Sequence, residues 1–175
     1  MLTGHPGCGK TTVLLRLKDR LCRAGLEVGG ILCPEIRETG GRVGFRVIDL
    51  LGREGILAHV SLQGRGNPTV GRYGVNLADL DGISREAFSR QADAYIVDEI
   101  GPMELKSRIF TAEIGRILNS PKPVVAAVHL RTSWGFIGKV KARPDATVVT
   151  VDSANRDRLP EHLAARILRT PKRHI

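Results

Sequence analysis

The sequence predicts an α/β fold, in which helices cover both faces of a mostly parallel sheet and antiparallel hairpin strands extend that sheet. Apolar residues recur at helical spacing in some segments, short continuous apolar runs lie between them, and Gly-rich turns separate the two kinds of segment. Such alternation is typical of parallel strands joined by helical crossovers. We expect one domain over residues 1–175, because this length with 42 % hydrophobic residues suffices for one sizeable core.

The first half of the chain begins with a predicted helix over residues 10–24, where Val13, Leu17 and Leu21 recur every four residues. Three extended runs follow, and we interpret them as antiparallel hairpin strands: 29–36, 43–50 and 56–62. Residues 63–81 are rich in Gly, Asn, Pro and Asp and lack periodicity, so the sequence predicts a loop there.

The second half predicts the parallel core. A short helix over 84–91 is expected before a buried strand that ends at Asp98 and Glu99. A helix, two buried strands and a closing helix should follow, over residues 105–118, 123–128, 147–151 and 159–167. Only three residues precede the Gly-rich segment at the start of the chain, so we expect a truncated first strand.

That Gly-rich segment, residues 4–11, fits the Walker A pattern G-x-x-x-x-G-K-[ST]. Glycines allow a tight curl in which backbone N–H groups and the start of the next helix bind phosphate oxygens. Lys10 would neutralise the β- and γ-phosphates, the Thr11 hydroxyl would ligate Mg²⁺, and Thr12 would lie near the α-phosphate. The predicted nucleotide-binding residues are Gly4, His5, Pro6, Gly7, Cys8, Gly9, Lys10, Thr11 and Thr12.

Asp98 and Glu99 follow an apolar strand and resemble a Walker B element. Because the ends of parallel strands converge where ligands bind, Asp98 can approach the Mg²⁺ held by Thr11. Glu99 would then face the γ-phosphate and orient or deprotonate an attacking water. The pair thus predicts a metal-binding residue and a catalytic residue.

Further candidates are weighed against ordinary structural roles. Arg72 and Arg131 could stabilise transition-state charge as catalytic residues, or be surface arginines. His129 could sense the γ-phosphate or be structural. The remaining candidates also have an ordinary structural interpretation. Asn155-Arg156-Asp157 could contact the base or cap a helix, and Tyr73 and Trp134 could stack on a base or pack in the core. We interpret Glu35, Arg37 and Glu38 as an ion-pair network rather than a site.

Several motifs together resemble the thermophile nucleoside-triphosphatase family, whose human relative is the cancer-related nucleoside-triphosphatase. They are residues 4–12, 34–38, 42–45, 70–75, 98–105 and 155–157. The resemblance covers nearly the whole chain and implies a RecA-like P-loop NTPase domain, a three-layer sandwich that slowly hydrolyses ATP, GTP and other nucleoside triphosphates with Mg²⁺. The family's roles carry over to Lys10, Thr11, Asp98 and Glu99. The short start and Cys33, where a hydroxyl residue is usual, depart from the pattern.

Amino-acid composition limits the classes of binding partner that we expect. Lys and Arg exceed Asp and Glu by 27 to 18, giving a net charge of +9, but these charges are scattered and aromatic residues make up only 4 %. Nucleic acid is therefore a possible but not a favoured partner. No apolar run approaches the roughly 18–20 residues that span a membrane, so we expect a cytoplasmic monomer without membrane association. The cysteines (Cys8, Cys22, Cys33) are odd in number and indicate free thiols.

Two other functions stay open at this stage. A nucleotide or polynucleotide kinase would use the same phosphate loop with a hydroxyl acceptor. A nucleic-acid-associated switch module would use ATP hydrolysis to time its association. Glu99 directly after Asp98 favours water as the acceptor, and no arginine-paired lid insertion of the kinase type is visible in the sequence.

Overall fold

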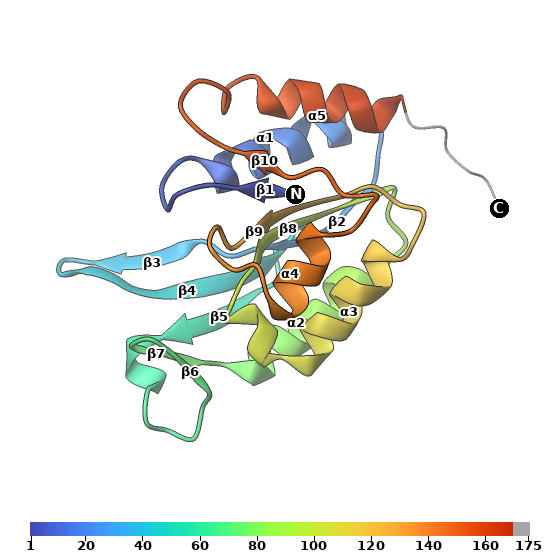
Figure 1. Ribbon diagram of the computed structural model, residues 1–175. Helices are drawn as coiled ribbons and strands as arrows, with labels where there is room; N and C mark the ends of the chain where they lie inside the picture. The colour runs from blue at the N-terminus through green and yellow to red at the C-terminus, as the bar shows by residue number, and fades with distance from the viewer. Residues whose placement is uncertain (170–175) are drawn as a thin grey trace.

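The computed structural model describes residues 1–169, and within them ten strands form one mixed sheet (Figure 1). In chain order the strands are β1 (Leu2–Thr3), β2 (Val28–Leu32), β3 (Glu35–Glu38), β4 (Gly41–Asp49), β5 (Glu54–His59), β6 (Thr69–Val70), β7 (Tyr73–Val75), β8 (Ala94–Ile100), β9 (Val124–Val128) and β10 (Val149–Thr150). Across the sheet they run β10-β1-β9-β8-β2-β4-β5-β7-β6, and β3 pairs with β4. The five strands from β10 to β2 are parallel, and the remainder are antiparallel. The α/β fold with a largely parallel core and antiparallel strands is therefore confirmed.

Within the described part of the chain, five helices cover the two faces of this sheet. They are α1 (Lys10–Arg23), α2 (Leu77–Ser89), α3 (Arg108–Leu118), α4 (Gly135–Lys141) and α5 (Leu159–Leu168), with short 3₁₀ turns η1 (Val60–Leu62) and η2 (Glu104–Lys106). Figure 1 shows α1 and α5 together on one face and α2, α3 and α4 on the other. Each face has its own apolar cluster, because the helices turn a buried stripe toward the sheet.

The layer of α1 and α5 holds the phosphate loop. Val13, Leu17 and Leu21 of α1 are at most 1 % exposed and pack against the sheet, as the four-residue spacing predicts. The short strand β1 lies between β10 and β9, where Leu2 pairs with both Val149 and Ala127 and is 1 % exposed. Two residues of strand are thus enough to place the Gly-rich loop within the parallel part of the sheet.

The predicted strand over residues 29–36 is wrong in its extent and in its pairing. The structure divides it into β2 and β3, because Pro34 has no N–H to donate and interrupts the strand. β2 is not a hairpin strand: it pairs in parallel with β8 and antiparallel with β4, so it joins the two parts of the sheet. Gly30, with φ of +128°, permits this position, because a Cβ there would lie 1.8 Å from the Ile96 carbonyl oxygen.

The predicted loop over residues 63–81 is also partly wrong. It contains the short strands β6 and β7 and the first five residues of α2, which begins at Leu77. Asn76 caps the helix, since its side chain accepts a hydrogen bond from the Asp79 N–H at 3.3 Å. Strands of two and three residues are too short to show a period, and α4 was missed for a similar reason, since it spans only seven residues.

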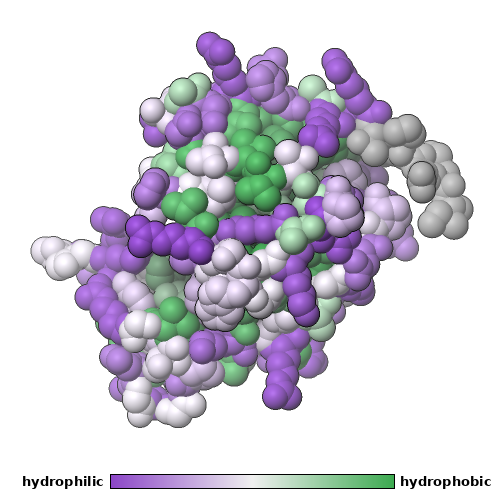
Figure 2. Space-filling view, viewed as in Figure 1, coloured by the Kyte–Doolittle hydropathy of each residue, from purple (hydrophilic) through white to green (hydrophobic). Residues whose placement is uncertain are grey.

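Hydrophilic side chains cover much of the periphery on the face shown in Figure 2. No helix within residues 1–169 combines the length and the apolar character that a membrane span requires.

The close approach at Gly30 predicts a large loss of stability on Gly30→Ala. The added methyl group would displace β8 and force an alanine into a backbone conformation that favours glycine, so we expect a loss of at least about 3 kcal/mol of unfolding free energy. The matched control is Gly115→Ala in α3, where a Cβ meets nothing within 4 Å and helix propensity should add about 0.5–1 kcal/mol. Urea unfolding of both variants measures this, and equal stabilities would contradict the packing described for β2.

Candidate active site

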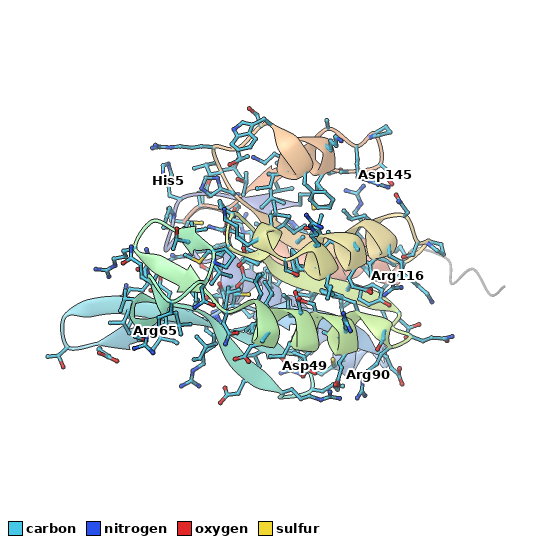
Figure 3. All side chains as sticks on the ribbon, turned by 90° about the horizontal axis from the view of Figure 1, so that it is seen from below. His5, Asp49, Arg65, Arg90, Arg116 and Asp145 are labelled. Carbon is cyan, nitrogen blue, oxygen red and sulfur yellow. The ribbon has the colours of Figure 1, made fainter. Side chains whose placement is uncertain are left out.

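A cavity of about 1330 Å³ opens at the carboxyl ends of the parallel strands. It brings together candidates that are far apart in the chain: residues of the phosphate loop, Asp98, Glu99, Arg72, His129 and Arg131. His5, one of the residues lining it, lies at the end of the molecule opposite Arg90, Arg116 and Asp145 (Figure 3). In parallel sheets this edge is where ligands bind, because the loops that follow the strands converge there.

The phosphate loop ends in an open helix N-terminus. Gly9 is the N-cap of α1, and it provides no side-chain hydrogen bond to the first turn. That turn also contains no acidic residue. The first N–H groups of a helix have no partners within the helix, and the helix dipole makes this end attractive to anions. The arrangement therefore leaves a set of backbone donors available for phosphate oxygens.

Gly4 and Lys10 complete the loop. A Cβ on Gly4 would lie 2.7 Å from the Val151 carbonyl oxygen and 2.8 Å from Cys8 Sγ, so only glycine fits between the loop and the residue that follows β10. Lys10 Nζ donates to the carbonyl oxygens of Gly4 at 3.0 Å and His5 at 3.4 Å. The ammonium group is thus held over the loop by hydrogen bonds to carbonyl oxygens, which phosphate oxygens can replace.

Asp98 and Thr11 connect the two halves of the site. The Thr11 hydroxyl donates to Asp98 Oδ2 at 2.6 Å, although the two residues are 87 positions apart. Asp98 lies in β8, is 4 % exposed, and is joined to Glu99 by a cis peptide bond. Burial raises the pKa of Asp98 to about 6, with a smaller contribution from the charge of Glu99, while the Thr11 hydrogen bond and Lys10 act in the opposite direction.

These two side chains fit a Mg²⁺ ion. A hydroxyl oxygen and a carboxylate oxygen are adjacent, and oxygen is the ligand that Mg²⁺ prefers. The described residues 1–169 contain no group of three or more His, Cys, Asp or Glu side chains that could hold a metal by themselves. In nucleotide sites Mg²⁺ takes one or two protein ligands, and phosphate and water oxygens complete its coordination.

Glu104 is a buried acid to which the sequence analysis assigned no role. It lies in η2, lines the cavity, is 5 % exposed, and accepts a hydrogen bond from the Gly101 N–H at 3.1 Å. A Cβ on Gly101 would lie 2.9 Å from Glu104 Oε2 and 3.0 Å from Glu99 Oε1, so the two carboxyl groups lie on the same side of that glycine. Burial, reinforced by the charges of Glu99 and Asp98, raises the pKa of Glu104 to about 8. The sequence feature that could have indicated a buried Glu104 is its position between the apolar residues 103 and 105.

Cys33, the residue that departs from the family pattern, also lines the cavity. Burial raises the pKa of its thiol well above the ordinary value, and the charges of Glu104 and Asp98 act in the same direction. The residue is therefore an uncharged thiol beside the acids.

Arg131 and His129 belong to one loop after β9. His129 Nδ1 and Thr132 Oγ1 are 2.7 Å apart. Lys141 of α4 donates to the carbonyl oxygens of His129, Leu130 and Thr132 at 2.7, 3.0 and 2.8 Å. One ammonium group thereby fixes the path of the loop that brings Arg131 to the cavity. Lys141 was missed because α4 was not predicted.

The remaining candidates divide between the cavity and the surface. Arg72 and Tyr73 line the cavity, whereas Trp134 is 79 % exposed and outside both the core and the cavity, so its expected core packing is wrong. Glu35 forms the expected ion pair with Arg37 at 2.8 Å and a further one, which was not expected, with Arg42 at 2.7 Å, and all three line the cavity. Glu38, also expected in this network, forms no ion pair with any residue among 1–169.

The segment Asn155-Arg156-Asp157 does not cap α5, whose N-cap is Arg158. The Asn155 side chain donates to the Thr150 carbonyl oxygen at 2.8 Å and accepts from the Asp152 N–H at 3.1 Å. Arg156 lies against the phosphate loop, since a Cβ on Gly9 would be 3.3 Å from Arg156 Cδ.

The raised pKa of Glu104 predicts a pH-dependent cost of burial. Folded Glu104 keeps its proton up to about pH 8, whereas the unfolded chain loses it above pH 4.5. The stability of the protein with respect to this group is therefore greatest below pH 4.5 and decreases until the pH has risen through about 8. Glu104→Gln keeps an acceptor for the Gly101 N–H and cannot ionise. It should match the wild type at pH 5 and exceed its unfolding free energy at pH 9 by on the order of 2 kcal/mol or more.

Urea unfolding at both pH values, without nucleotide or metal, measures this difference. Glu161→Gln, on an exposed position of α5, serves as the control and should follow the wild type at both pH values. A constant difference between Glu104→Gln and wild type across pH would contradict a buried, proton-binding Glu104.

Known proteins that are similar to this chain over most of its length are nucleoside-triphosphatases. The model of the family described as NTPase matches residues 1–164. The nucleoside-triphosphatase THEP1 of Methanothermobacter thermautotrophicus is 44 % identical over 163 residues, covering 91 % of this chain and 90 % of that protein. THEP1 of Thermofilum pendens is 44 % identical over 172 residues, covering 95 % and 93 %.

Two solved structures are similar over nearly their whole length. The crystal structure of THEP1 from Aquifex aeolicus superposes with a TM-score of 0.78 at 30 % identity, covering 96 % of this chain and 98 % of that one. The solution structure of a human cancer-related nucleoside triphosphatase gives a TM-score of 0.79 at 29 % identity, with 98 % and 97 % coverage.

Proposed function

The chain belongs to the NTPase family, and on that premise we propose that it hydrolyses nucleoside triphosphates to the diphosphate and phosphate. Membership confirms the resemblance inferred from the motifs. One observation carries the proposal: the hydrogen bond between Thr11 and Asp98 puts an open helix N-terminus and a buried carboxylate into one cavity, with Glu99 beside them. Phosphate binding and water activation both need these groups close together.

We expect substrate binding to begin at the backbone donors of the loop. The N–H groups at the start of α1 would hold the β- and γ-phosphates, and Lys10 would exchange its carbonyl partners for phosphate oxygens. Thr11 and Asp98 would hold Mg²⁺, which when bound neutralises charge on the same phosphates. The predicted role of each loop residue from Gly4 to Thr12 thus stays a proposal that this geometry supports.

Glu99 is the proposed water-activating residue. It lines the cavity next to Asp98, and water is the acceptor we propose. The water oxygen would attack the γ-phosphorus while the bond from that phosphorus to the β–γ bridging oxygen breaks, and the proton of the water would pass to the Glu99 carboxylate. The buried carboxyl of Glu104, on the same side of Gly101, limits where the Glu99 side chain can lie.

Of the two candidate arginines, Arg131 is the better placed to stabilise the transition state. It follows β9, which pairs with both β1 and β8, and therefore lies between the phosphate loop and Asp98 in the order of strands. Arg72 precedes β7, near the far edge of the sheet, and reaches the cavity from the other end. His129 stays a candidate γ-phosphate sensor in the loop that Lys141 holds.

We also propose broad base specificity and slow turnover, as the resemblance implies. In the segment considered for base contact, the Asn155 amide donates to the Thr150 carbonyl oxygen and accepts from the Asp152 N–H, and both hydrogen bonds compete with contact to a base. Arg156, which lies against the phosphate loop, can stack on any base, since every base has a π-face. A base would thus be bound without discrimination between the different bases.

Two substitutions separate binding from hydrolysis. Lys10→Ala should abolish both nucleoside-triphosphate binding at the phosphate loop and turnover, because it removes the cation over the phosphates. Glu99→Gln should retain Mg²⁺-dependent binding and lower kcat by at least about 100-fold, because the amide cannot accept the proton. Phosphate release from ATP, GTP, CTP and UTP, without any added acceptor, measures turnover in both variants, and calorimetric titration with the Mg²⁺–nucleotide complex measures binding.

Glu38→Gln, in the exposed β3–β4 hairpin, is the control and should leave phosphate release unchanged. Normal turnover in Glu99→Gln would show that another group activates the water. Conversion of ATP to ADP that requires an added hydroxyl acceptor, with transfer of the phosphoryl group to that acceptor in place of phosphate release, would favour the kinase alternative. Stimulation of turnover by added nucleic acid would favour the switch module.

A further inference from the structure

The cavity extends beyond the groups that hydrolysis requires. Its volume of about 1330 Å³ exceeds the roughly 300–1,000 Å³ of a typical small-molecule site. The part farthest from the phosphate loop is lined from β3, β4 and the β6–β7 hairpin: Glu35, Arg37, Arg42, Phe45, Val70, Arg72 and Tyr73. The proposed mechanism uses little of this region.

The order of strands places this region across the acids from the phosphate loop. The loop follows β1, Asp98 and Glu99 lie on β8, Arg42 and Phe45 lie on β4, and Tyr73 lies on β7. Because β8 is between β1 and β4 in the sheet, the acids separate the two parts of the cavity. Figure 1 shows the β3–β4 hairpin extending on the same side as the loop between β1 and α1.

Arg42, Phe45, Arg72 and Tyr73 form what we call the arginine–aromatic cluster. The Phe45 and Tyr73 rings meet edge to face, with centroids 5.5 Å apart. The Arg42 guanidinium lies 5.0 Å from the Phe45 centroid and 6.0 Å from that of Tyr73, and Arg72 lies 5.3 Å from Tyr73. Planar cations and rings are stacked together within the wall of a cavity.

The cluster is already held in place. Arg42 donates to the Tyr73 hydroxyl at 3.2 Å and to Glu35 at 2.7 Å, and Arg72 donates to the Arg42 carbonyl oxygen. Tyr73 is 7 % exposed. The hydrogen bonds from Arg42 and Arg72 lower the pKa of Tyr73, which reflects the positive field there. These side chains would therefore lose little conformational entropy when a ligand binds.

The charge and shape of this wall define a ligand class. Three arginines, Arg37, Arg42 and Arg72, face one acid, Glu35, so the region favours an anion. Guanidinium groups bind phosphate through paired N–H donors, whereas aromatic and guanidinium planes stack on flat rings. Arg42 is 38 % exposed at its side chain, so it can reach a ligand while stacked.

We propose that the arginine–aromatic cluster is a second ligand site, which takes a nucleoside monophosphate across Asp98 and Glu99 from the phosphate loop. The placement of this site relative to the triphosphate rests on the proposed function, but its binding can be measured without it. The phosphate would pair with arginine, and the base would stack on the exposed planes of the cluster.

The test is calorimetric titration of the full chain with AMP, GMP, CMP and UMP. Lys10→Ala, which disables the phosphate loop, should bind these mononucleotides as the wild type does. In the Lys10→Ala background, adding Arg42→Gln should weaken binding by at least about 10-fold, the loss expected for charged hydrogen bonds. Arg42→Lys, which keeps the charge but not the planar group, should also bind more weakly. Ribose 5-phosphate and inorganic phosphate should bind at least about 10-fold more weakly than mononucleotides.

Arg46→Gln is the matched control, since Arg46 lies on the same strand, pairs with Glu54 at 3.1 Å and does not line the cavity. It should bind mononucleotides as its parent does, and thermal unfolding checks that each variant is folded. Lack of mononucleotide binding by Lys10→Ala, or equal binding by the Arg42 and Arg46 variants, would overturn the proposal. Ribose 5-phosphate binding as tightly as AMP would overturn it as well.

The two proposals fail in different ways. If the wild type releases phosphate from ATP but Lys10→Ala binds no mononucleotide, the second site is wrong and hydrolysis stands. If the wild type releases no phosphate from ATP, the proposed function is wrong, and mononucleotide binding by Lys10→Ala alone then decides the second site.

Discussion

The hydrogen bond from the Thr11 hydroxyl to Asp98 is the contact on which the rest of the site depends. It joins the first turn of α1 to β8 at 2.6 Å. Because β1 and β8 both pair with β9, the sheet sets the separation of the phosphate loop and the two acids before any ligand binds. Backbone donors from a helix N-terminus and a buried acceptor then share one cavity, which is the arrangement that phosphoryl transfer requires.

Burial determines the chemistry of the acids at the centre of the cavity. Asp98 and Glu104 are 4 % and 5 % exposed, and in both burial raises the pKa. Basic groups lie on either side: Lys10 and Arg131 toward the phosphate loop, and the arginine–aromatic cluster toward β4 and β7. This carboxyl edge of the sheet thus places negative groups between two positive regions, which suits two anionic ligands rather than one. Keeping acids buried costs stability, as is common where function requires shifted pKa values.

Most of the parallel core could be predicted from the sequence, because α1, β8 and β9 have strong local patterns. The closeness of Thr11 and Asp98 also followed from a general rule about strand ends. Pairing partners could not be predicted: β2 joins β8 only because Gly30 permits the approach. Glu104 and Lys141 were missed because their importance comes from burial and from contacts with distant carbonyl groups. Trp134 was misplaced because its aromatic type, without its environment, suggested the core.

A crystal structure of the chain with Mg²⁺ and a non-hydrolysable ATP analogue tests the central claim most directly. The account predicts the triphosphate on the N–H groups at the start of α1 and the metal between the Thr11 hydroxyl and the Asp98 carboxylate, with Glu99 facing the γ-phosphate. A triphosphate bound elsewhere in the cavity, or a metal that neither Thr11 nor Asp98 approaches, would contradict it.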